Sequence, residues 1–357
     1  MKNRKKISTF TLRDLFRPIM NKGNVTIKDI ARELEIAPST VSRALKDHPD
    51  ISPETKKLVN ELADRWNYRP NPIALSLKGG TSRTLGIVVP EIIHYFFSSV
   101  ISGIEDYSNE QDYNVMICQS NEEYEKEVKS IETLVNSRVD GILISLSKLT
   151  RSMEHFHQLR ERNIPLVFFD RVSEEVESDR VVVDDSEGAY MATRHLILEG
   201  RKRIVHLSGP PNLAITKDRI DGYIRALNEF QCAVAEENIV KCDQVKEAEW
   251  IVPGLMKRNP PPDAFFCVND FTAAQTLKLI KKLGFRIPED VAIVGFTNGQ
   301  LSSLTDPGLS TVDQHGYDMG REAARLLIER IKDRMRPYQQ RVIKTELVIR
   351  GSSVAGR

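Results

Sequence analysis

The sequence has few cysteines and no long apolar run. Its four cysteines, Cys118, Cys232, Cys242 and Cys267, show no CxxC spacing, so we expect reduced thiols, as is typical of a reducing cytoplasm. No apolar run approaches the roughly 20 residues that a membrane-spanning helix needs, and the basic N-terminus lacks the apolar core of a signal peptide. We therefore predict a cytoplasmic protein with no membrane partner.

The familiar motifs of enzymes are also missing. No GxGxxG follows a predicted strand, and neither a GxxxxGK[ST] phosphate loop nor a GxSxG nucleophile turn is present. His155 and His157 are two residues apart on a predicted helix, so they point in different directions, which favours a solvated face over a metal site. We predict that the chain is not an enzyme and has no catalytic residues, metal or cofactor.

Charge is balanced over the 357 residues but unevenly distributed. The net charge is +1, yet the first 80 residues hold 16 Lys and Arg against 9 Asp and Glu, and the remainder holds 35 against 41. A basic head on an acidic body indicates that the head binds a polyanion. The basic residues 1–24 form a predicted flexible extension, either an arm that touches DNA phosphates or a frayed tail.

The stretch 25–45 has the pattern of two short helices joined by a turn. Apolar residues recur at helical spacing up to Leu34, and the pattern resumes after Pro38, which suits a first helical turn. The polar face of the second helix carries Ser39, Thr40, Ser42 and Arg43. Arg pairs with guanine and short hydroxyl side chains contact phosphates and base edges, so this face suits the major groove of DNA. An ordinary helical hairpin is the alternative.

A third helix and a short one follow. Ser52 before Pro53 reads as a helix N-cap, and Leu58, Leu62 and Trp66 at intervals of four predict a helix that closes a small core. Residues 71–78 then predict a helix of about seven residues, too short to be stable alone.

From residue 84 the pattern becomes an alternation of apolar strands and amphipathic helices, in two successive sets. Such alternation predicts parallel sheets covered on both faces, here in two similar lobes with a cleft between them. A helix near 316–333 and a strand at 342–350 come after both sets, so the chain is expected to cross between the lobes more than once.

In these motifs the sequence resembles the lactose-repressor (LacI/GalR) family of bacterial transcription regulators. The resemblance runs from Val25 to Ser353 and rests on the order and spacing of several segments. They are Val25-Thr-Ile-Lys-Asp-Ile-Ala, Ser39-Thr-Val-Ser-Arg, Asn67-Tyr-Arg-Pro-Asn, Ala74-Leu-Ser-Leu, Leu85-Gly-Ile-Val-Val-Pro, Gly209-Pro, Arg219-Ile-Asp-Gly-Tyr, Asn269-Asp270, Val294-Gly-Phe and Ile349-Arg-Gly-Ser-Ser.

The resemblance implies an α/β protein with a three-helix helix-turn-helix domain, a hinge helix and a two-lobed core like a periplasmic binding protein. The expected domains are the extension at 1–24, the DNA-binding domain at 25–70 and the hinge and linker at 71–83. The N-terminal lobe is expected at 84–183 and 310–338, and the C-terminal lobe at 184–309 and 339–357. No heptad tail follows Val354, which favours a dimer over a tetramer.

The resemblance also assigns DNA-binding residues. Ser39, Thr40, Ser42, Arg43 and Lys46 are expected to face the major groove, and Thr26, Lys28, Ile51 and Thr55 the DNA backbone. In the hinge, Leu77 takes the place of a wedge that opens a central base step, assisted by Ala74 and beside Lys78; such a wedge trades unstacking for a kink. Pairing with the hinge of a second chain on DNA would explain how so short a helix folds.

For the cleft, the resemblance implies an effector site of aromatic and polar residues. The expected members are Phe96, Phe97, Asp170, Arg171, Arg219, Asp270 and Gln314. Aromatic faces stack on sugar rings, and Asp170 ends a strand, where open α/β sheets bind ligands. Core packing is the alternative for Phe97, and a plain surface charge is the alternative for Arg219 and Asp270.

Several positions depart from the family pattern. Glu35 stands in the turn where the family has Gly, and Ala37 replaces a Ser cap. Leu213 and Gln244 stand where purine-sensing members carry an Arg and an aromatic, which disfavours a purine effector. Thr297 and Asn298 replace an acidic pair, which leaves a polar contact there in doubt.

The predicted function is that of a transcriptional repressor, nucleoid-associated when bound to DNA. A homodimer would bind a palindromic double-stranded operator, gated by a sugar or sugar derivative in the cleft. The alternative is a sugar-binding protein or a carbohydrate enzyme whose basic head serves another role.

Overall fold

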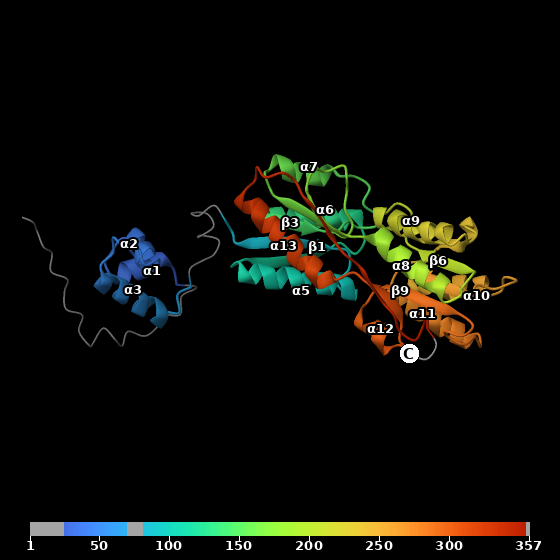
Figure 1. Ribbon diagram of the computed structural model, residues 1–357. Helices are drawn as coiled ribbons and strands as arrows, with labels where there is room; N and C mark the ends of the chain where they lie inside the picture. The colour runs from blue at the N-terminus through green and yellow to red at the C-terminus, as the bar shows by residue number, and fades with distance from the viewer. Residues whose placement is uncertain (1–24, 70–80, 355–357) are drawn as a thin grey trace, which may run out of the picture. The chain divides into compact units, whose positions relative to one another are not determined.

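The computed structural model describes residues 25–69 and 81–354, which form two compact units, one within residues 1–82 and the other within 83–357 (Figure 1). In this described part, no helix combines the length and apolarity that a membrane crossing requires.

The first unit is a bundle of three helices: α1 (Ile27–Glu33), α2 (Pro38–Ala44) and α3 (Pro53–Arg65). Its buried core is formed by Ile30, Ala31, Val41, Ala44, Val59, Leu62 and Ala63. The predicted cap at Ser52 is confirmed, because its hydroxyl accepts a hydrogen bond from the Thr55 amide at 3.2 Å. The prediction for Leu58 is wrong, because its side chain is exposed. The face of α3 that packs in the core carries its neighbour Val59 instead.

The second unit contains two six-stranded sheets. The first has the order β11-β5-β4-β3-β1-β2, with all strands parallel. Its strands are β1 (Thr84–Val89), β2 (Asn114–Gln119), β3 (Gly141–Ile144), β4 (Leu166–Phe169), β5 (Asp179–Val183) and β11 (Gln340–Ile343).

The second sheet has the order β12-β10-β9-β8-β6-β7 and is parallel except for its edge strand β12. Its strands are β6 (Ile204–Ser208), β7 (Ile239–Lys241), β8 (Ala264–Cys267), β9 (Ala292–Thr297), β10 (Ser310–Asp313) and β12 (Glu346–Val348). The predicted pair of largely parallel sheets is thereby confirmed.

Helices cover both faces of each sheet, as the continuous apolar strands require. On the first sheet, α5 (Tyr95–Glu110) and α13 (Gly316–Lys332) share one core, and α6 (Tyr124–Asn136) and α7 (Glu154–Glu161) share another. On the second sheet, α10 (Val245–Leu255) and α11 (Asp270–Lys282) pack on one side, and α8 (Asp185–Leu198) and α9 (Ala214–Glu229) on the other. The short helices η2 (Glu236–Asn238) and α12 (Gln300–Leu304) lie in connections of the second lobe.

Two glycines allow α5 and α13 to touch along their backbones. A Cβ added to Gly320 would lie 2.0 Å from the carbonyl oxygen of Val100, and one added to Gly103 would lie 2.0 Å from that of Tyr317. Such distances exclude any side chain, so these glycines fix the position of α5, whose first turn borders the cleft described below.

The chain crosses between the two sheets three times: after β5, after β10 and between β11 and β12 (Figure 1). This corrects the expected lobe boundaries, since β10 at 310–313 belongs to the second sheet and β11 at 340–343 to the first. The single strand expected at 342–350 is likewise two short strands that join different sheets. The error has a physical reason: an apolar strand pattern indicates a strand but not the sheet that it joins.

Candidate functional sites

The second helix of the first unit presents a polar face to solvent. Ser39, Arg43 and Lys46 are exposed, and Thr40 and Ser42 are half-buried beside the core residues Val41 and Ala44. In the described residues, no ion pair occupies Arg43 or Lys46. Their positive charges are therefore free to meet phosphates or base edges.

Three of the residues expected at the DNA backbone also have structural roles within the first unit. The Thr26 hydroxyl donates to Asp29 at 2.6 Å in a capping box of α1, and Thr55 lies in the first turn of α3. Ile51 is half-buried against the helical core. Lys28 is exposed on α1, whereas Ala74, Leu77 and Lys78 lie outside the described residues.

Glu35, in the turn between α1 and α2, has a left-handed backbone with φ of 49°. A side chain is disfavoured in that conformation, which agrees with the family's use of glycine there. Ala37 offers no side-chain hydrogen bond to α2, whose first residue is Pro38.

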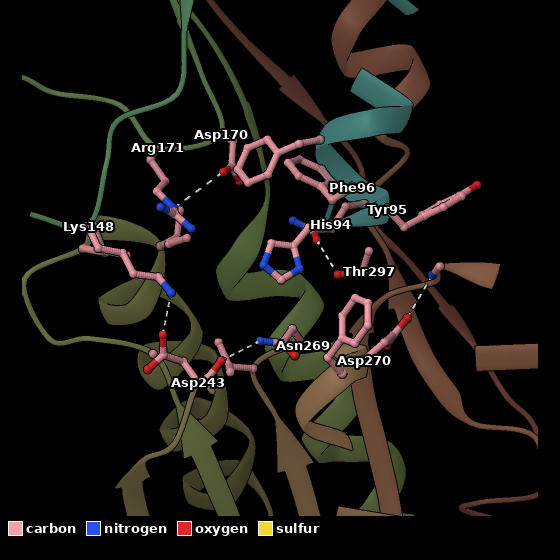
Figure 2. A pocket seen from close by; sticks show the side chains of 18 of the residues that line it. His94, Tyr95, Phe96, Lys148, Asp170, Arg171, Asp243, Asn269, Asp270 and Thr297 are labelled. Carbon is pink, nitrogen blue, oxygen red and sulfur yellow. Dashed lines mark hydrogen bonds and ion pairs between the residues drawn. The ribbon is translucent and has the colours of Figure 1, made fainter. Parts of the chain in front are cut away.

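In the second unit, a cavity of about 340 Å³ lies between the two lobes, at the carboxyl ends of the parallel strands (Figure 2). This is the place at which open α/β sheets bind ligands. All seven residues expected at the effector site line it: Phe96, Phe97, Asp170, Arg171, Arg219, Asp270 and Gln314.

Phe96 and Phe97 form the aromatic wall, in the first turn of α5. Their rings meet edge to face with centroids 5.3 Å apart, and both belong to the core that α5 shares with α13. Packing and lining of the cavity are therefore combined in Phe97 rather than alternatives.

Asp170 and Arg171 directly follow β4. Asp170 is 5% exposed and has a left-handed backbone with φ of 59°, a strained conformation of the kind found at functional sites. Burial raises the pKa of Asp170, opposed by the nearby Arg171 and Arg219 guanidinium groups and by a hydrogen bond from Ser145. Arg171 itself donates to Glu122 at 2.8 Å.

Arg219, on α9, is 5% exposed, so it is not a surface charge. Its Nε donates to Asp185 at 2.7 Å, its Nη1 donates to the Val268 carbonyl at 2.8 Å, and its guanidinium lies 3.8 Å from the centroid of Phe296. Burial raises the pKa of Asp185 to about 6, with the Arg219 charge opposing the rise. Asp185 therefore holds the guanidinium rigidly at the cavity wall.

Asp270 is the first residue of α11 and is also buried. It accepts hydrogen bonds from the Thr311 hydroxyl at 2.5 Å and the Gly299 amide at 2.9 Å. Burial raises its pKa to about 6, against the effect of those bonds. Gln314 is buried on the crossover after β10 and accepts from the Thr297 hydroxyl at 3.1 Å. Thr297, where a contact was in doubt, lines the cavity.

Sequence reasoning missed many other residues that line the cavity. They include His94, Tyr95, Glu122, Lys148, Asp243, Asn269 and Phe271. Lys148 follows β3 and Asp243 follows β7, so the strand-end rule that found Asp170 could also have found them. Figure 2 shows Lys148 reaching toward Asp243, to whose Oδ2 its Nζ donates at 2.7 Å.

Leu213 lines the cavity, whereas Gln244 caps the start of α10 and is not among the lining residues.

The solvated face expected for His155 and His157 is wrong for His155, which is buried and hydrogen-bonded to the buried Glu127 at 3.0 Å. An acceptor on a neighbouring helix made that burial possible, and sequence spacing alone gave no sign of it.

Comparisons with known proteins match both units. Residues 26–71 match the family model for bacterial regulatory proteins of the lacI family. Residues 82–349 match the model for periplasmic binding proteins and the sugar-binding domain of the LacI family.

Similar proteins cover most of the chain. The HTH-type transcriptional repressor PurR of Vibrio atlanticus (strain LGP32) is 36% identical over 323 residues, covering 89% of this chain and 95% of that protein. The structure of the transcriptional regulator CelR in complex with cellobiose is 27% identical with a TM-score of 0.70, covering 92% of this chain and 100% of that one. The lac repressor dimer bound to operator and the anti-inducer ONPF shares the fold, with a TM-score of 0.82, 21% identity and coverage of 93% and 100%.

A helix-turn-helix unit joined to a two-lobed core with a ligand-sized cleft defines a class of DNA-binding transcriptional regulators. This chain belongs to the LacI family of bacterial transcriptional regulators. The members of that family regulate transcription and are not enzymes.

Proposed function

We propose that this protein is a repressor that binds a palindromic operator as a homodimer and is gated by a small neutral sugar in the interlobe cleft. The observation that carries the proposal is the convergence of aromatic, carboxylate and guanidinium groups on one cavity, in a chain that also carries a helix-turn-helix unit with exposed polar and basic side chains on its second helix. A ligand with different affinities for two lobe arrangements would shift the DNA-competent population, and a few kcal/mol is enough.

The proposed operator contacts centre on α2 and on Lys46 just after it. Ser39, Thr40, Ser42, Arg43 and Lys46 would read the major groove, with Thr26, Lys28, Ile51 and Thr55 at the backbone. One such helix reads only half a site, so two copies at a fixed spacing are required. We assign that spacing to residues 71–83, with Leu77 as the apolar wedge, Ala74 beside it and Lys78 near the phosphates.

The first sheet offers a surface for the second copy. Its outermost strand β2 carries the exposed apolar side chains Met116 and Ile117. An unpaired edge strand with exposed apolar side chains is prone to association, which supports self-association through this edge. A protein that binds the chromosome acts where the chromosome lies, so we place it in the cytoplasm, nucleoid-associated when bound.

The charges of the cavity favour a neutral effector. Its three cations, Lys148, Arg171 and Arg219, each pair with a carboxylate of the chain itself. An acidic ligand would have to displace one of those carboxylates. A polyol can instead donate its hydroxyls to Asp170 and Asp270 and stack on Phe96.

A purine base is the second candidate, because relatives named PurR are among the most similar proteins. Leu213 argues against it, since this apolar side chain lines the cavity at the position where purine-sensing members carry an arginine. A purine is a planar ring with hydrogen-bond acceptors, whereas a sugar is a ring that carries hydroxyl groups, so the two ligands need different partners in the site.

A thermal-shift panel of neutral sugars, acidic sugars, sugar phosphates and purine bases separates these candidates. A ligand at 100 times its Kd stabilises the folded chain by about 2.7 kcal/mol. A melting shift with a neutral sugar supports the proposal, and a shift confined to purine bases or sugar phosphates overturns the effector class. Turnover of the bound sugar would show an enzyme instead.

Leu77→Ala tests the hinge. We expect it to weaken binding to a selected palindrome strongly, with effector binding unchanged, because the wedge contacts DNA alone. Binding is measured by fluorescence anisotropy at several salt concentrations, since phosphate contacts make affinity salt-dependent. Unchanged operator affinity would remove the hinge from the mechanism, and full-length protein with no preference for any palindrome would overturn the regulator function.

A further inference from the structure

One ion pair spans the cleft between the lobes. Lys148 lies in the loop after β3 of the first sheet, and Asp243 follows β7 of the second. Their charged atoms are 2.7 Å apart, and the Asp243 side chain is 4% exposed. Within residues 25–69 and 81–354, it is the one Lys or Arg ion pair that joins the two lobes; the contact of His315 with Asp313 at 3.8 Å lies within the crossover after β10.

A second contact joins the lobes at the same residue. The Asn212 side chain, from the loop after β6, donates its Nδ2–H to the Lys148 carbonyl oxygen at 2.9 Å. Lys148 is thus held by the second lobe through both its side chain and its backbone. We call Lys148, Asp243 and Asn212 the clasp.

The clasp is rigidly attached to the first lobe. The Lys148 amide donates to Glu122 at 2.8 Å, and the Ser147 amide donates to the fully buried Glu127 at 2.8 Å. Two carboxylates on or beside α6 therefore fix the backbone of the loop, and Lys148 cannot follow Asp243 if the second lobe moves away.

The other end is equally fixed. Lys241 contacts the second carboxylate oxygen of Asp243 at 2.9 Å, and Asn269 donates to the Asp243 carbonyl at 3.3 Å. Burial would raise the pKa of Asp243, but the two lysines outweigh it and lower that pKa, so the carboxylate is charged at neutral pH.

We infer that the clasp holds the lobes closed in the ligand-free protein and thereby sets the balance between its open and closed forms. With Lys148 present, the buried carboxylate is compensated from both lobes. Without it, the carboxylate keeps only Lys241, and opening the cleft returns it to water, so opening becomes favourable. The inference concerns the same cleft as the proposed function, but its test uses neither ligand nor DNA and can fail independently.

The test measures the distance between the lobes in the full-length, ligand-free chain. Nitroxides are attached through p-acetylphenylalanine at Glu132 on α6 and Asn228 on α9, both exposed and one in each lobe, and distances are read by double electron–electron resonance. The variant is Lys148→Met, which keeps the aliphatic stem and removes the charge. We expect the population at longer distances to rise about tenfold from a minor one.

The chain supplies a matched control. Lys241→Met removes an equal charge from the same Asp243 carboxylate, but within one lobe. We expect its distances to superpose on those of the wild type. If Lys148→Met superposes on the wild type, or if both variants shift alike, the clasp is not what holds the lobes.

Salt gives a second readout on unmodified side chains, which keeps the inference testable if Lys148→Met fails to fold. Raising NaCl from about 0.05 M to about 1 M shortens the screening length from over 10 Å to about 3 Å. The wild type should shift toward longer distances, and a variant that lacks the pair, Asp243→Asn, should not. Equal responses of the two proteins would overturn the clasp.

Discussion

The two functional regions of this chain treat charge in opposite ways. Arg43 on α2 and Lys46 just after it are exposed and held by no ion pair of the described residues; in the cleft, Arg219 and Lys148 are held by carboxylates of the chain itself. Exposed charges act on a partner and contribute little to folding. Buried pairs organise the site and the fold at once, so the same substitution has different consequences in the two regions.

Arg219→Met should give the largest effect. It leaves the Asp185 carboxylate and the Val268 carbonyl without their partner, and breaking a buried ion pair costs about 3–5 kcal/mol of unfolding free energy. Urea unfolding of the purified chain measures the loss. Arg225→Met on the same helix removes an exposed pair with Glu187 and should cost less than about 1 kcal/mol; equal losses would erase the contrast between buried and exposed charge.

Asp270 should make the unfolding free energy of the chain depend on pH. Its pKa is about 6 in the folded chain and near 3.8 when unfolded, so the folded form holds the proton more tightly. The resulting stability is fully present below pH 4 and is lost as the pH rises through 6, a change of about 3 kcal/mol.

Asp270→Asn removes that titration. The difference in unfolding free energy between wild type and variant should change in the variant's favour from about pH 4 to about pH 7, as measured by urea unfolding at each pH. A difference that is constant with pH would contradict a raised pKa.

Arg43→Ala should separate function from stability in the first unit. We expect operator affinity to fall by about 1–3 kcal/mol, the value of a bidentate base contact, while unfolding free energy changes by less than about 0.5 kcal/mol. Anisotropy titration and urea unfolding check the two parts. Arg65→Ala on α3 is the exposed comparison; if its affinity loss matched that of Arg43→Ala, α2 would lose its special role.

Glu35→Gly should give the smallest effect. Glycine adopts the left-handed turn at φ 49° without steric cost, which stabilises the first unit by at most about 1 kcal/mol after its own entropy is counted. In a Trp250→Phe background the fluorescence of Trp66 reports this unit alone, since the chain has two tryptophans. Lys57→Gly inside α3 should destabilise it by about 1 kcal/mol, and a similar loss for Glu35→Gly would refute the strain.

Local patterns predicted a large part of what the structure contains. The cap at Ser52, the three-helix head and the two sheets follow from capping chemistry and from apolar periods that act over a few residues. The seven cleft residues, expected from the resemblance to the family, also line one cavity at the carboxyl ends of the parallel strands. Lys148 and Asp243 also follow strands and were missed. A strand end indicates a residue at the cleft, but it does not indicate that two loops 95 residues apart form an ion pair.

The sequence by itself determined the order of elements, the basic head, the family and the kinds of side chain that strand ends present. The tertiary structure alone decided that β10 joins the second sheet and β11 the first, that His155 is buried against Glu127, and that Lys148 pairs with Asp243 across the cleft. The physical reason is the distance along the chain over which each interaction acts. Helical period, capping and charge act between near neighbours, whereas strand pairing and buried ion pairs depend on which distant segments share one low-dielectric space.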